Sequence, residues 1–358
     1  MKVLLFTIEY PPFKGGVANY YGNLVANWPE PENILVLNNN ENQLIHRWAL
    51  PKWRPAVCAL RRLVRREKPE HIIIGNILPL GTAVLLATRF KKIPYTVILH
   101  GMDLMYSQKS WRKRYLAKKI LRKAQHVITN SKYVADLAKK IINQPEKIHA
   151  VNPGIDMQPP NPKIVEEIKT RHNLENMTIM FSVSRLVKRK GQDKVLECLN
   201  EAVKSVPNLY YFIAGDGPDK IYLHEKAKGV KNVVFLGKIS DEEKQAWLSI
   251  CDFFAMPARE TEGDLEGFGI VYLEAAIHAK AVLAGESGGV KDAVLGGQTG
   301  ILVNPLDKRK ITDAIIKLAS EKETRDLLGR NAQERVLRDF RWEDKIKKIY
   351  DIINKVNI

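Results

Sequence analysis

The apolar run IMFSV at residues 179–183 is followed by the basic loop SRLVKRKG at residues 184–191, and a helical stretch begins at Gln192. A short apolar run bounded by a loop and a helix is typical of a strand buried in a parallel sheet. Similar runs recur on both sides of it, at residues 3–6, 34–37, 72–74, 96–99, 127–129, 210–214, 233–236, 253–256, 282–284 and 301–303. Strands that alternate with helices in this way predict doubly wound α/β sheets.

The chain is long enough to form two such sheets. It has 358 residues, of which 45% are hydrophobic, whereas one ordinary domain takes about 100 to 200 residues. Residues 152–162 contain four prolines and Gly154, which disfavour both helix and strand, so we expect a linker there. The last segment, residues 342–356, places isoleucines at the spacing of an amphipathic helix. We therefore predict two α/β domains and a C-terminal helix.

The cysteines and the apolar segments limit the setting of the protein. Three widely separated cysteines predict neither a disulfide framework nor a zinc site, and they fit a reducing compartment. The first apolar run is too short for an export signal, because Glu9 and two prolines follow it closely. Residues 72–88 lack charge, but glycine, asparagine and proline interrupt them, so we expect a strand, a loop and a helix rather than a membrane span.

The positive charge of the chain is concentrated in its first half. Of the net charge of +17, residues 1–150 carry +16, since they hold 25 Lys and Arg against 9 Asp and Glu. Such asymmetry indicates an anionic partner, which is a nucleic acid, a membrane surface or an acidic substrate. A well-solvated basic surface that aids solubility is the simpler alternative.

Two candidate binding positions follow strands of the first half, where ligands of open α/β sheets bind. Gly15 and Gly16 open a helix, and paired glycines let the backbone approach a phosphate or a sugar at a helix N-terminus. A tight strand-to-helix turn explains the same glycines. His100 directly follows another strand, where it can donate to a sugar hydroxyl or carry a proton near neutral pH. A structural role is the alternative for a single histidine.

The basic loop of residues 184–191 is a candidate phosphate site. Arg185 can bind two oxygens of a diphosphate, and Lys190 can act as a point charge. A solvated basic loop is the usual explanation of such a charge run. Gly191 and the helix that follows it favour phosphate binding instead.

The segment EGFGIVYLE at residues 266–274 lies between a strand and a helix. Its residues Gly267, Phe268 and Gly269 form the predicted helix entrance, where backbone amides face a phosphate. Glu266 and Glu274 flank this entrance, which suits a sugar near the first carboxylate and a ribose near the second. Since the neighbours of Glu274 are almost all apolar, we expect its carboxylate to have a partner.

Together these residues resemble the retaining glycosyltransferases of family 4, which have the GT-B fold. The resemblance covers nearly the whole chain, and residues 266–274 are its most specific part. The order of the other motifs supports it: Gly15-Gly16, His100-Gly101, NPGID at 152–156, Arg185 with Lys190, and GDGP at 215–218. It implies two Rossmann-like, doubly wound domains that face a central cleft. The implied boundaries are 1–157 plus 343–358 for the acceptor-side domain, and 158–342 for the nucleotide-sugar-binding domain.

The resemblance also implies a role for each candidate residue. In this family, the arginine and the lysine bind the donor diphosphate, the first glutamate binds the donor sugar, and the second binds ribose. The corresponding residues here are Arg185, Lys190, Glu266 and Glu274. The resemblance further implies that His100 contacts the donor sugar and that Gly16 lies near the diphosphate and the acceptor.

Two departures from the family pattern limit this transfer of roles. Residues 259–265 form a long polar stretch to which no family contacts are carried over, and Asp292 stands where a glutamate is usual.

The implied reaction moves a hexose from a nucleoside diphosphate sugar to an acceptor hydroxyl with retention of configuration. The resemblance implies front-face attack, in which the departing phosphate helps to remove the acceptor proton. Arg185 and Lys190 would stabilise the leaving-group charge, so we expect neither a metal ion nor another cofactor. The sequences of residues 267–274 and 152–156 are most similar to those of mannosyltransferases that act on lipid-linked acceptors. We therefore expect a cytoplasmic enzyme, peripheral at the inner face of an anionic membrane.

Two alternatives remain. A sugar-nucleotide epimerase of the GT-B fold would consume the donor without an acceptor. A basic nucleic-acid-binding protein would interleave aromatic residues with its charges, as Trp48, Trp53 and Trp111 do. No nucleic-acid-binding signature is recognised, and the phosphate-site residues lie in the neutral half, so we do not expect a nucleic acid partner.

Overall fold

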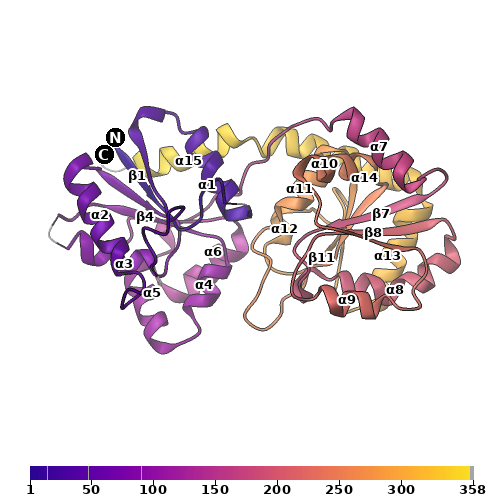
Figure 1. Ribbon diagram of the computed structural model, residues 1–358, viewed down its shortest axis with the longest axis horizontal. Helices are drawn as coiled ribbons and strands as arrows, with labels where there is room; N and C mark the ends of the chain where they lie inside the picture. Colours follow the sequence, from indigo (N-terminus) through magenta and orange to yellow (C-terminus); the bar gives the residue numbers. More distant parts are fainter. Residues whose placement is uncertain (14, 47, 90, 355–358) are drawn as a thin grey trace. The chain divides into compact units, whose positions relative to one another are not determined.

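In the computed structural model, which describes residues 1–13, 15–46, 48–89 and 91–354, the strands form two six-stranded sheets. Every strand pair in both sheets is parallel. The chain divides into two compact units, one of Met1–Gly154 with the segment from Trp342 onwards, and one of Ile155–Arg341. Figure 1 shows that helices cover both faces of each sheet. The predicted doubly wound α/β architecture is confirmed.

The first unit has the strand order β2-β1-β3-β4-β5-β6. Its strands are β1 (Val3–Phe6), β2 (Ile34–Leu37), β3 (His71–Ile74), β4 (Tyr95–Leu99), β5 (His126–Thr129) and β6 (Ile148–Ala150). Its helices are α1 (Gly16–Ala26), α2 (Arg54–Glu67), α3 (Leu80–Ala87), α4 (Met102–Ser107), α5 (Trp111–Lys123), α6 (Lys132–Ile141) and α15 (Trp342–Asn354). The uncharged residues 72–88 form a strand, a loop and a helix, as predicted.

Alternating side chains of the first sheet belong to two cores, one on each face. On β1, Leu4 and Phe6 join one cluster, whereas Val3 and Leu5 join the other. Both faces are covered, so the strand is apolar throughout rather than alternating.

The second core contains α15, the C-terminal helix, which packs in the first unit. Trp342, Ile346, Ile349 and Ile353 are buried there. A Cβ atom on Gly154 would lie 2.6 Å from the Trp342 ring, so the chain passes this helix in close contact. The isoleucine spacing thus predicted an amphipathic helix, which the structure confirms over Trp342–Asn354. The resemblance assigned this segment to the first domain as residues 343–358, of which 355–358 lie outside the described part of the chain.

The second unit has the strand order β12-β11-β10-β7-β8-β9. Its strands are β7 (Thr178–Val183), β8 (Leu209–Ala214), β9 (Val233–Gly237), β10 (Phe253–Met256), β11 (Ala281–Gly285) and β12 (Ile301–Val303). Its helices are α7 (Pro162–His172), α8 (Gln192–Ser205), α9 (Lys220–Lys226), α10 (Asp241–Ile250), α11 (Ile270–Ile277), α12 (Val290–Ala293), α13 (Lys308–Ser320) and α14 (Lys322–Asp339).

Each sheet has one point at which the strand order reverses. In the first sheet it lies between β1 and β3, and in the second between β7 and β10. The loops that leave such neighbouring strands diverge to opposite faces of the sheet, and the crevice between them is the usual ligand site of this architecture. The loops after β1, β3, β7 and β10 are therefore the positions to examine.

Each predicted strand is confirmed to within one residue at either end. Strand β6 was missed. It is only three residues long and carries His149 at its centre, so it lacks the apolar run that identifies the other strands. Among the described helices, none is long and apolar enough to cross a membrane.

Candidate functional site

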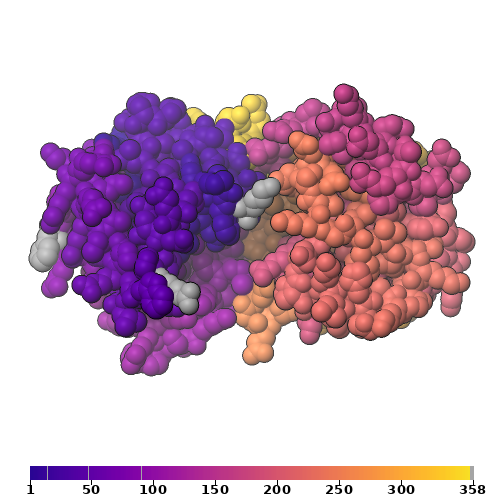
Figure 2. Space-filling model, in the orientation of Figure 1, coloured from indigo at the N-terminus to yellow at the C-terminus, as the bar shows by residue number. Residues whose placement is uncertain are grey.

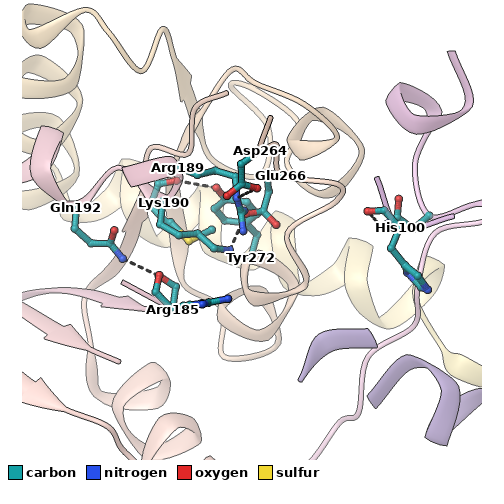
Figure 3. Close-up of polar contacts among 11 residues, drawn as sticks. His100, Arg185, Arg189, Lys190, Gln192, Asp264, Glu266 and Tyr272 are labelled. Carbon is teal, nitrogen blue, oxygen red and sulfur yellow. Dashed lines mark hydrogen bonds and ion pairs between the residues drawn. The ribbon is translucent and has the colours of Figure 1, made fainter. Parts of the chain in front are cut away.

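A cluster of charged side chains lies at the switch point of the second sheet. The loop after β7 supplies Arg189 and Lys190, and the loop after β10 supplies Asp264 and Glu266 (Figure 3). The Nζ atom of Lys190 lies 2.7 Å from Oε2 of Glu266, which also pairs with the Arg189 guanidinium. The Nε atom of Arg189 lies 2.7 Å from Oδ1 of Asp264.

Glu266 is held as an anion although its side chain is only 10% exposed. Burial by itself raises its pKa, but the charges and hydrogen bonds of Lys190 and Arg189 outweigh burial, so the pKa of Glu266 is lowered overall. The site therefore presents an ionised carboxylate with a lysine directly beside it.

Arg189 was not predicted as a site residue. It stands in a run of cations in which Lys188 is exposed and Lys190 points to Glu266. A 3-10 turn over Lys188–Lys190 turns Arg189 and Lys190 towards the same carboxylate. The sequence offered only the charge of Arg189 as a signal, because spacing alone does not tell which of three consecutive cations faces inward.

Arg185 follows β7 on the same loop, but the structure does not bring it into this cluster. Its side chain is exposed and forms no hydrogen bond or ion pair within the described part of the chain (Figure 3). Next to it, Ser184 accepts a 2.6 Å hydrogen bond from Gln192 at the start of α8. Arg185 is thus a cation at the switch point with no partner in the described protein.

A second ion pair joins the loop after β10 to the first turn of α8, the helix that follows the loop after β7. Arg259 donates two hydrogen bonds of 2.8 Å to Asp193, and their side chains are only 10% and 5% exposed. The amide of Arg259 also donates to the carbonyl of Arg189 at 2.8 Å. The polar stretch 259–265, to which no role was transferred, therefore holds the two site loops together.

The glycine segment forms the entrance of α11, as predicted. Gly269 is the N-cap with φ of +88°, and a Cβ atom there would lie 2.5 Å from the Tyr272 ring. Only glycine fits this combination of a left-handed backbone and close packing. Gly267 lies beside it in the same buried segment. Phe268 is buried and packs near Phe340. Its side chain is therefore not free to contact the predicted donor substrate, which leaves its backbone for such a contact.

The turn after β11 packs against the backbone of Glu266. The amide of Gly289 donates to the Glu266 carbonyl at 2.8 Å. Gly288 has φ of +56°, and a Cβ atom there would lie 2.3 Å from the same carbonyl oxygen. This turn therefore packs closely against the backbone of the glutamate segment.

Glu274 lies on α11 and has the partner that its apolar surroundings predicted. Its carboxylate pairs at 2.7 Å with Lys244 of α10. Burial lowers the pKa of Lys244, but Glu274 and Asp241 raise it by more, so the lysine pKa is raised overall. The pair is mostly shielded from solvent.

In the first unit, Gly16 begins α1 as predicted, and open space lies where its Cβ atom would be. His100 follows β4, and its Nε2 atom lies 3.0 Å from the Tyr21 hydroxyl. Burial lowers the pKa of His100 to about 4. Of the two roles considered for His100, burial favours a neutral ring that hydrogen-bonds over an imidazolium ion that carries a proton near neutral pH.

Asp103 fixes the backbone on both sides of this histidine. Its Oδ1 atom accepts hydrogen bonds from the amides of His100, Gly101 and Leu104 at 3.0–3.1 Å. Burial raises the pKa of Asp103 to about 6, while those amides oppose the shift. The histidine is thus held at a defined position at the end of its strand.

Comparison with known proteins agrees with this architecture. The family described as Glycosyltransferase Family 4 matches residues 15–159, and the family described as Glycosyl transferases group 1 matches residues 164–335. The chain is 27% identical, over 98% of both chains, to a GDP-mannose-dependent alpha-(1-6)-phosphatidylinositol monomannoside mannosyltransferase of Mycolicibacterium smegmatis. It is 26% identical to the monoacylated-substrate enzyme of that type from Corynebacterium glutamicum, over 98% of this chain and 97% of the relative.

Solved structures share the fold at low sequence identity. The structure of Anabaena HepE in complex with UDP-glucose has a TM-score of 0.83 and 19% identity, over 99% of this chain and 100% of that one. Sucrose-phosphate synthase from Thermosynechococcus elongatus has a TM-score of 0.82 and 17% identity, over 99% of both chains. The two family models, which together match residues 15–159 and 164–335, place the chain among the glycosyltransferases of family 4, and the solved structures show that it has the two Rossmann-like domains of the GT-B fold.

Proposed function

We propose that this enzyme transfers mannose from a nucleoside diphosphate to a hydroxyl of a lipid-linked glycan or glycolipid, with retention of configuration. The observation that carries the proposal is the ion pair of Lys190 with the buried Glu266 at the switch point of the second sheet. It provides a cation for a phosphate and a carboxylate for sugar hydroxyls within one site. Two relatives are named as GDP-mannose-dependent mannosyltransferases of phosphatidylinositol monomannoside, and these names favour mannose and a lipid acceptor.

In this proposal the second domain, residues 158–342, binds the nucleotide sugar. Lys190 and Arg185 bind the diphosphate, and the amides of Gly267 and Gly269 at the entrance of α11 add partial positive charge. Arg185 suits this role because its guanidinium has no partner in the described protein. When Lys190 moves to a phosphate, Arg189 remains on Glu266 and keeps that carboxylate ionised for the sugar.

Glu274 is proposed to bind the ribose hydroxyls, for which a carboxylate is a suitable acceptor. Its ion pair with Lys244 sets the direction of the carboxylate in the ligand-free protein. The first domain, residues 1–157 with 343–358, supplies His100 for the transferred sugar and Gly16 near the diphosphate and the acceptor.

The proposed chemistry is front-face attack by the acceptor hydroxyl. The departing phosphate takes up the acceptor proton, and the cations stabilise the negative charge that develops on it. Three side chains on one loop, Arg185, Arg189 and Lys190, are cationic at or beside this position. We therefore propose that the enzyme needs no divalent ion to stabilise the leaving group.

We further propose that the acceptor is met at an anionic membrane surface on the cytoplasmic side. Helices α2 and α5 both pack against α3, so they lie on one side of the first unit. On α2, the apolar positions face inward, while four arginines are exposed, Arg61, Arg62, Arg65 and Arg66. On α5, Ile120 and Leu121 are buried, whereas Trp111 and Tyr115 are 72% and 62% exposed.

Figure 2 shows α5 and the preceding α4 at the lower edge of the first unit, in purple and magenta. Exposed aromatic rings here lie beside cations: Nζ of Lys113 lies 3.6 Å from the Tyr106 ring centre, and the Arg112 guanidinium lies over Trp111 at 5.3 Å. Aromatic and basic side chains in this combination are typical of surfaces that bind the headgroup region of a bilayer. We call this side the α2–α5 face.

A donor panel tests the function. GDP-mannose, UDP-glucose and other nucleoside diphosphate sugars are compared for protection against thermal unfolding, because a ligand that binds only the native state raises its stability. GDP-mannose is then incubated with and without a phosphatidylinositol mannoside acceptor. We expect protection and an acceptor-dependent mannosylated product with retained configuration. Conversion of the donor sugar without any acceptor would instead identify an epimerase.

A further inference from the structure

The hydroxyl of Tyr21 in α1 lies between two groups of the first unit. Its oxygen is 2.8 Å from the carbonyl oxygen of Gly75, which follows β3, and 3.0 Å from Nε2 of His100, which follows β4. A phenol has one proton to donate, and a carbonyl oxygen only accepts. The Tyr21 hydroxyl therefore donates its proton to the Gly75 carbonyl. If it donated to His100 instead, the Tyr21 and Gly75 oxygens would be two buried acceptors 2.8 Å apart without a proton between them.

Once Tyr21 donates to Gly75, its oxygen is an acceptor for His100. The contact at 3.0 Å then requires a proton on Nε2 of His100. Since the pKa of His100 is lowered to about 4, the ring is neutral at pH 7 and has no second proton. Its Nδ1 atom is then unprotonated and can only accept a hydrogen bond. Burial, with smaller effects of Tyr20, Asp103 and Glu9, raises the pKa of Tyr21, so the phenol keeps its proton.

The surroundings of the ring keep this arrangement in place. Tyr20 packs edge to face against His100, with ring centres 4.9 Å apart and planes at 82°. The His100 amide is bound by Asp103, and its carbonyl accepts from Asn130 at 3.2 Å. Nδ1 forms no hydrogen bond within the described part of the chain, and His100 is half-buried rather than fully buried. This nitrogen therefore has no partner in the described protein and can accept a hydrogen bond from a ligand.

We propose that Tyr21 is a positioning residue that fixes His100 as the Nε2–H tautomer, so that Nδ1 binds only a substrate group that donates a hydrogen bond. A sugar hydroxyl meets this requirement, whereas a fluorine, a carbonyl or a phosphate oxygen does not. The choice of sugar as the ligand rests on the proposed function. The tautomer itself does not, because it is a property of the ligand-free protein.

The tautomer is measured by long-range ¹H–¹⁵N NMR correlation of the histidine rings in the full chain, without any donor, at pH 7. The His100 signals are assigned by their loss in His100→Gln. We expect a protonated Nε2 and an unprotonated Nδ1 in the parent protein. In Tyr21→Phe, which removes the acceptor, we expect a mixture of both tautomers. A protonated Nδ1 in the parent protein would overturn the proposal, even if the variant failed to fold.

A matched control separates this effect from the loss of a buried phenol. The Tyr95 hydroxyl also donates to a backbone carbonyl, that of Ile120 at 2.7 Å, and the residue is likewise buried in the first unit. Tyr95→Phe should leave the His100 signals unchanged. If Tyr21→Phe folds and keeps the pure Nε2–H tautomer, Tyr21 does not determine it and the proposal fails.

The consequence for the substrate is tested with singly fluorinated donor sugars, since fluorine can accept but not donate. At one sugar position, the parent enzyme should prefer hydroxyl over fluorine in kcat/KM, and this preference should fall by about tenfold or more in Tyr21→Phe. Equal preference in parent and variant at every position would contradict the proposed ligand of Nδ1. Failure of all donors to bind would refute the proposed function and leave the tautomer result standing.

Discussion

Lys190 and Glu266 form an ion pair of 2.7 Å in which both side chains are nearly buried. The cation proposed for the donor diphosphate is thus bound, in the ligand-free protein, to the carboxylate proposed for the donor sugar. Arg189 and Asp264 extend the pair into a chain of alternating charges. A diphosphate can replace Glu266 on Lys190 without leaving the carboxylate unpaired, because Arg189 stays beside it.

Replacing Arg185 or Lys190 with alanine should lower turnover by about 10² to 10³, since each removes positive charge from the leaving phosphate. The circular dichroism spectrum should not change. Lys188→Ala is the matched control, because Lys188 is an exposed cation of the same loop that points to the Tyr222 ring instead. Near-normal kcat in both test variants would remove the two residues from the mechanism.

Glu266 should make the free energy of unfolding depend on pH. Its pKa is lowered on folding, so its ionised form stabilises the protein above the unfolded-state pKa of about 4.3 and loses this effect as the pH falls through the lower folded value. Glu266→Gln should destabilise the protein by about 1–3 kcal/mol at pH 7, and by less at pH 4. Urea unfolding at both pH values measures this. A difference that grows on acidification would contradict the assignment.

The ion pair of Arg259 and Asp193 should be important for stability. Arg259→Ala leaves a buried carboxylate without its bidentate partner, which should cost about 3–5 kcal/mol in chemical denaturation. Arg309→Ala is the control. Arg309 is 91% exposed and lies 3.9 Å from Asp313, so its removal should change stability by less than about 0.5 kcal/mol. Equal effects of the two variants would show that burial of the first pair is unimportant.

Activity should survive exhaustive chelation of divalent ions, because the proposed mechanism assigns stabilisation of the leaving group to the cations of the loop after β7. Initial rates are compared with chelator, and after magnesium or manganese is added back. Loss of activity on chelation, with recovery on metal addition, would show that a divalent ion takes part.

The α2–α5 face should bind vesicles that contain anionic lipid, in sedimentation at low and moderate salt. Substituting serine at Arg61, Arg62, Arg65 and Arg66 should weaken this severely, since each basic side chain near an anionic leaflet contributes about 1 kcal/mol. Transfer to a water-soluble acceptor should persist. The control variant carries serine at four exposed cations of the second unit: Arg309, Lys310, Lys317 and Lys322.

The same experiment distinguishes the membrane from other anionic partners. Equal binding of the parent protein to neutral and anionic vesicles would rule out an electrostatic role of the arginines. Tight binding to an oligonucleotide, with none to vesicles, would favour a nucleic acid partner.

Most of the fold could be predicted from local patterns in the sequence. Apolar runs of three to five residues identified the buried strands, and the isoleucines of α15 identified a helix with one apolar face. The proline-rich residues 152–162 include the point at which the two compact units divide. These features are visible because burial imposes a fixed period on neighbouring residues. Strand β6 was missed because His149 interrupts its apolar residues, so it shows no apolar run.

The site was predictable only in part. Sequence position placed Lys190, Glu266 and Glu274 after the correct strands, because ligand sites of this architecture lie at strand ends. It did not distinguish Arg189, which pairs with Glu266, from Arg185, which is exposed and unpaired in the described chain.

What the sequence by itself determined is therefore the α/β architecture, the order of its elements and the strand ends that carry charged residues. The tertiary structure alone decided the partners: Lys244 for Glu274, Asp193 for Arg259, and Tyr21 for His100, which are 30, 66 and 79 positions apart. The reason is physical. Local periodicity records whether a side chain is buried, whereas pairing across the sheet depends on which loops the strand order brings together and on the rotamers that packing allows.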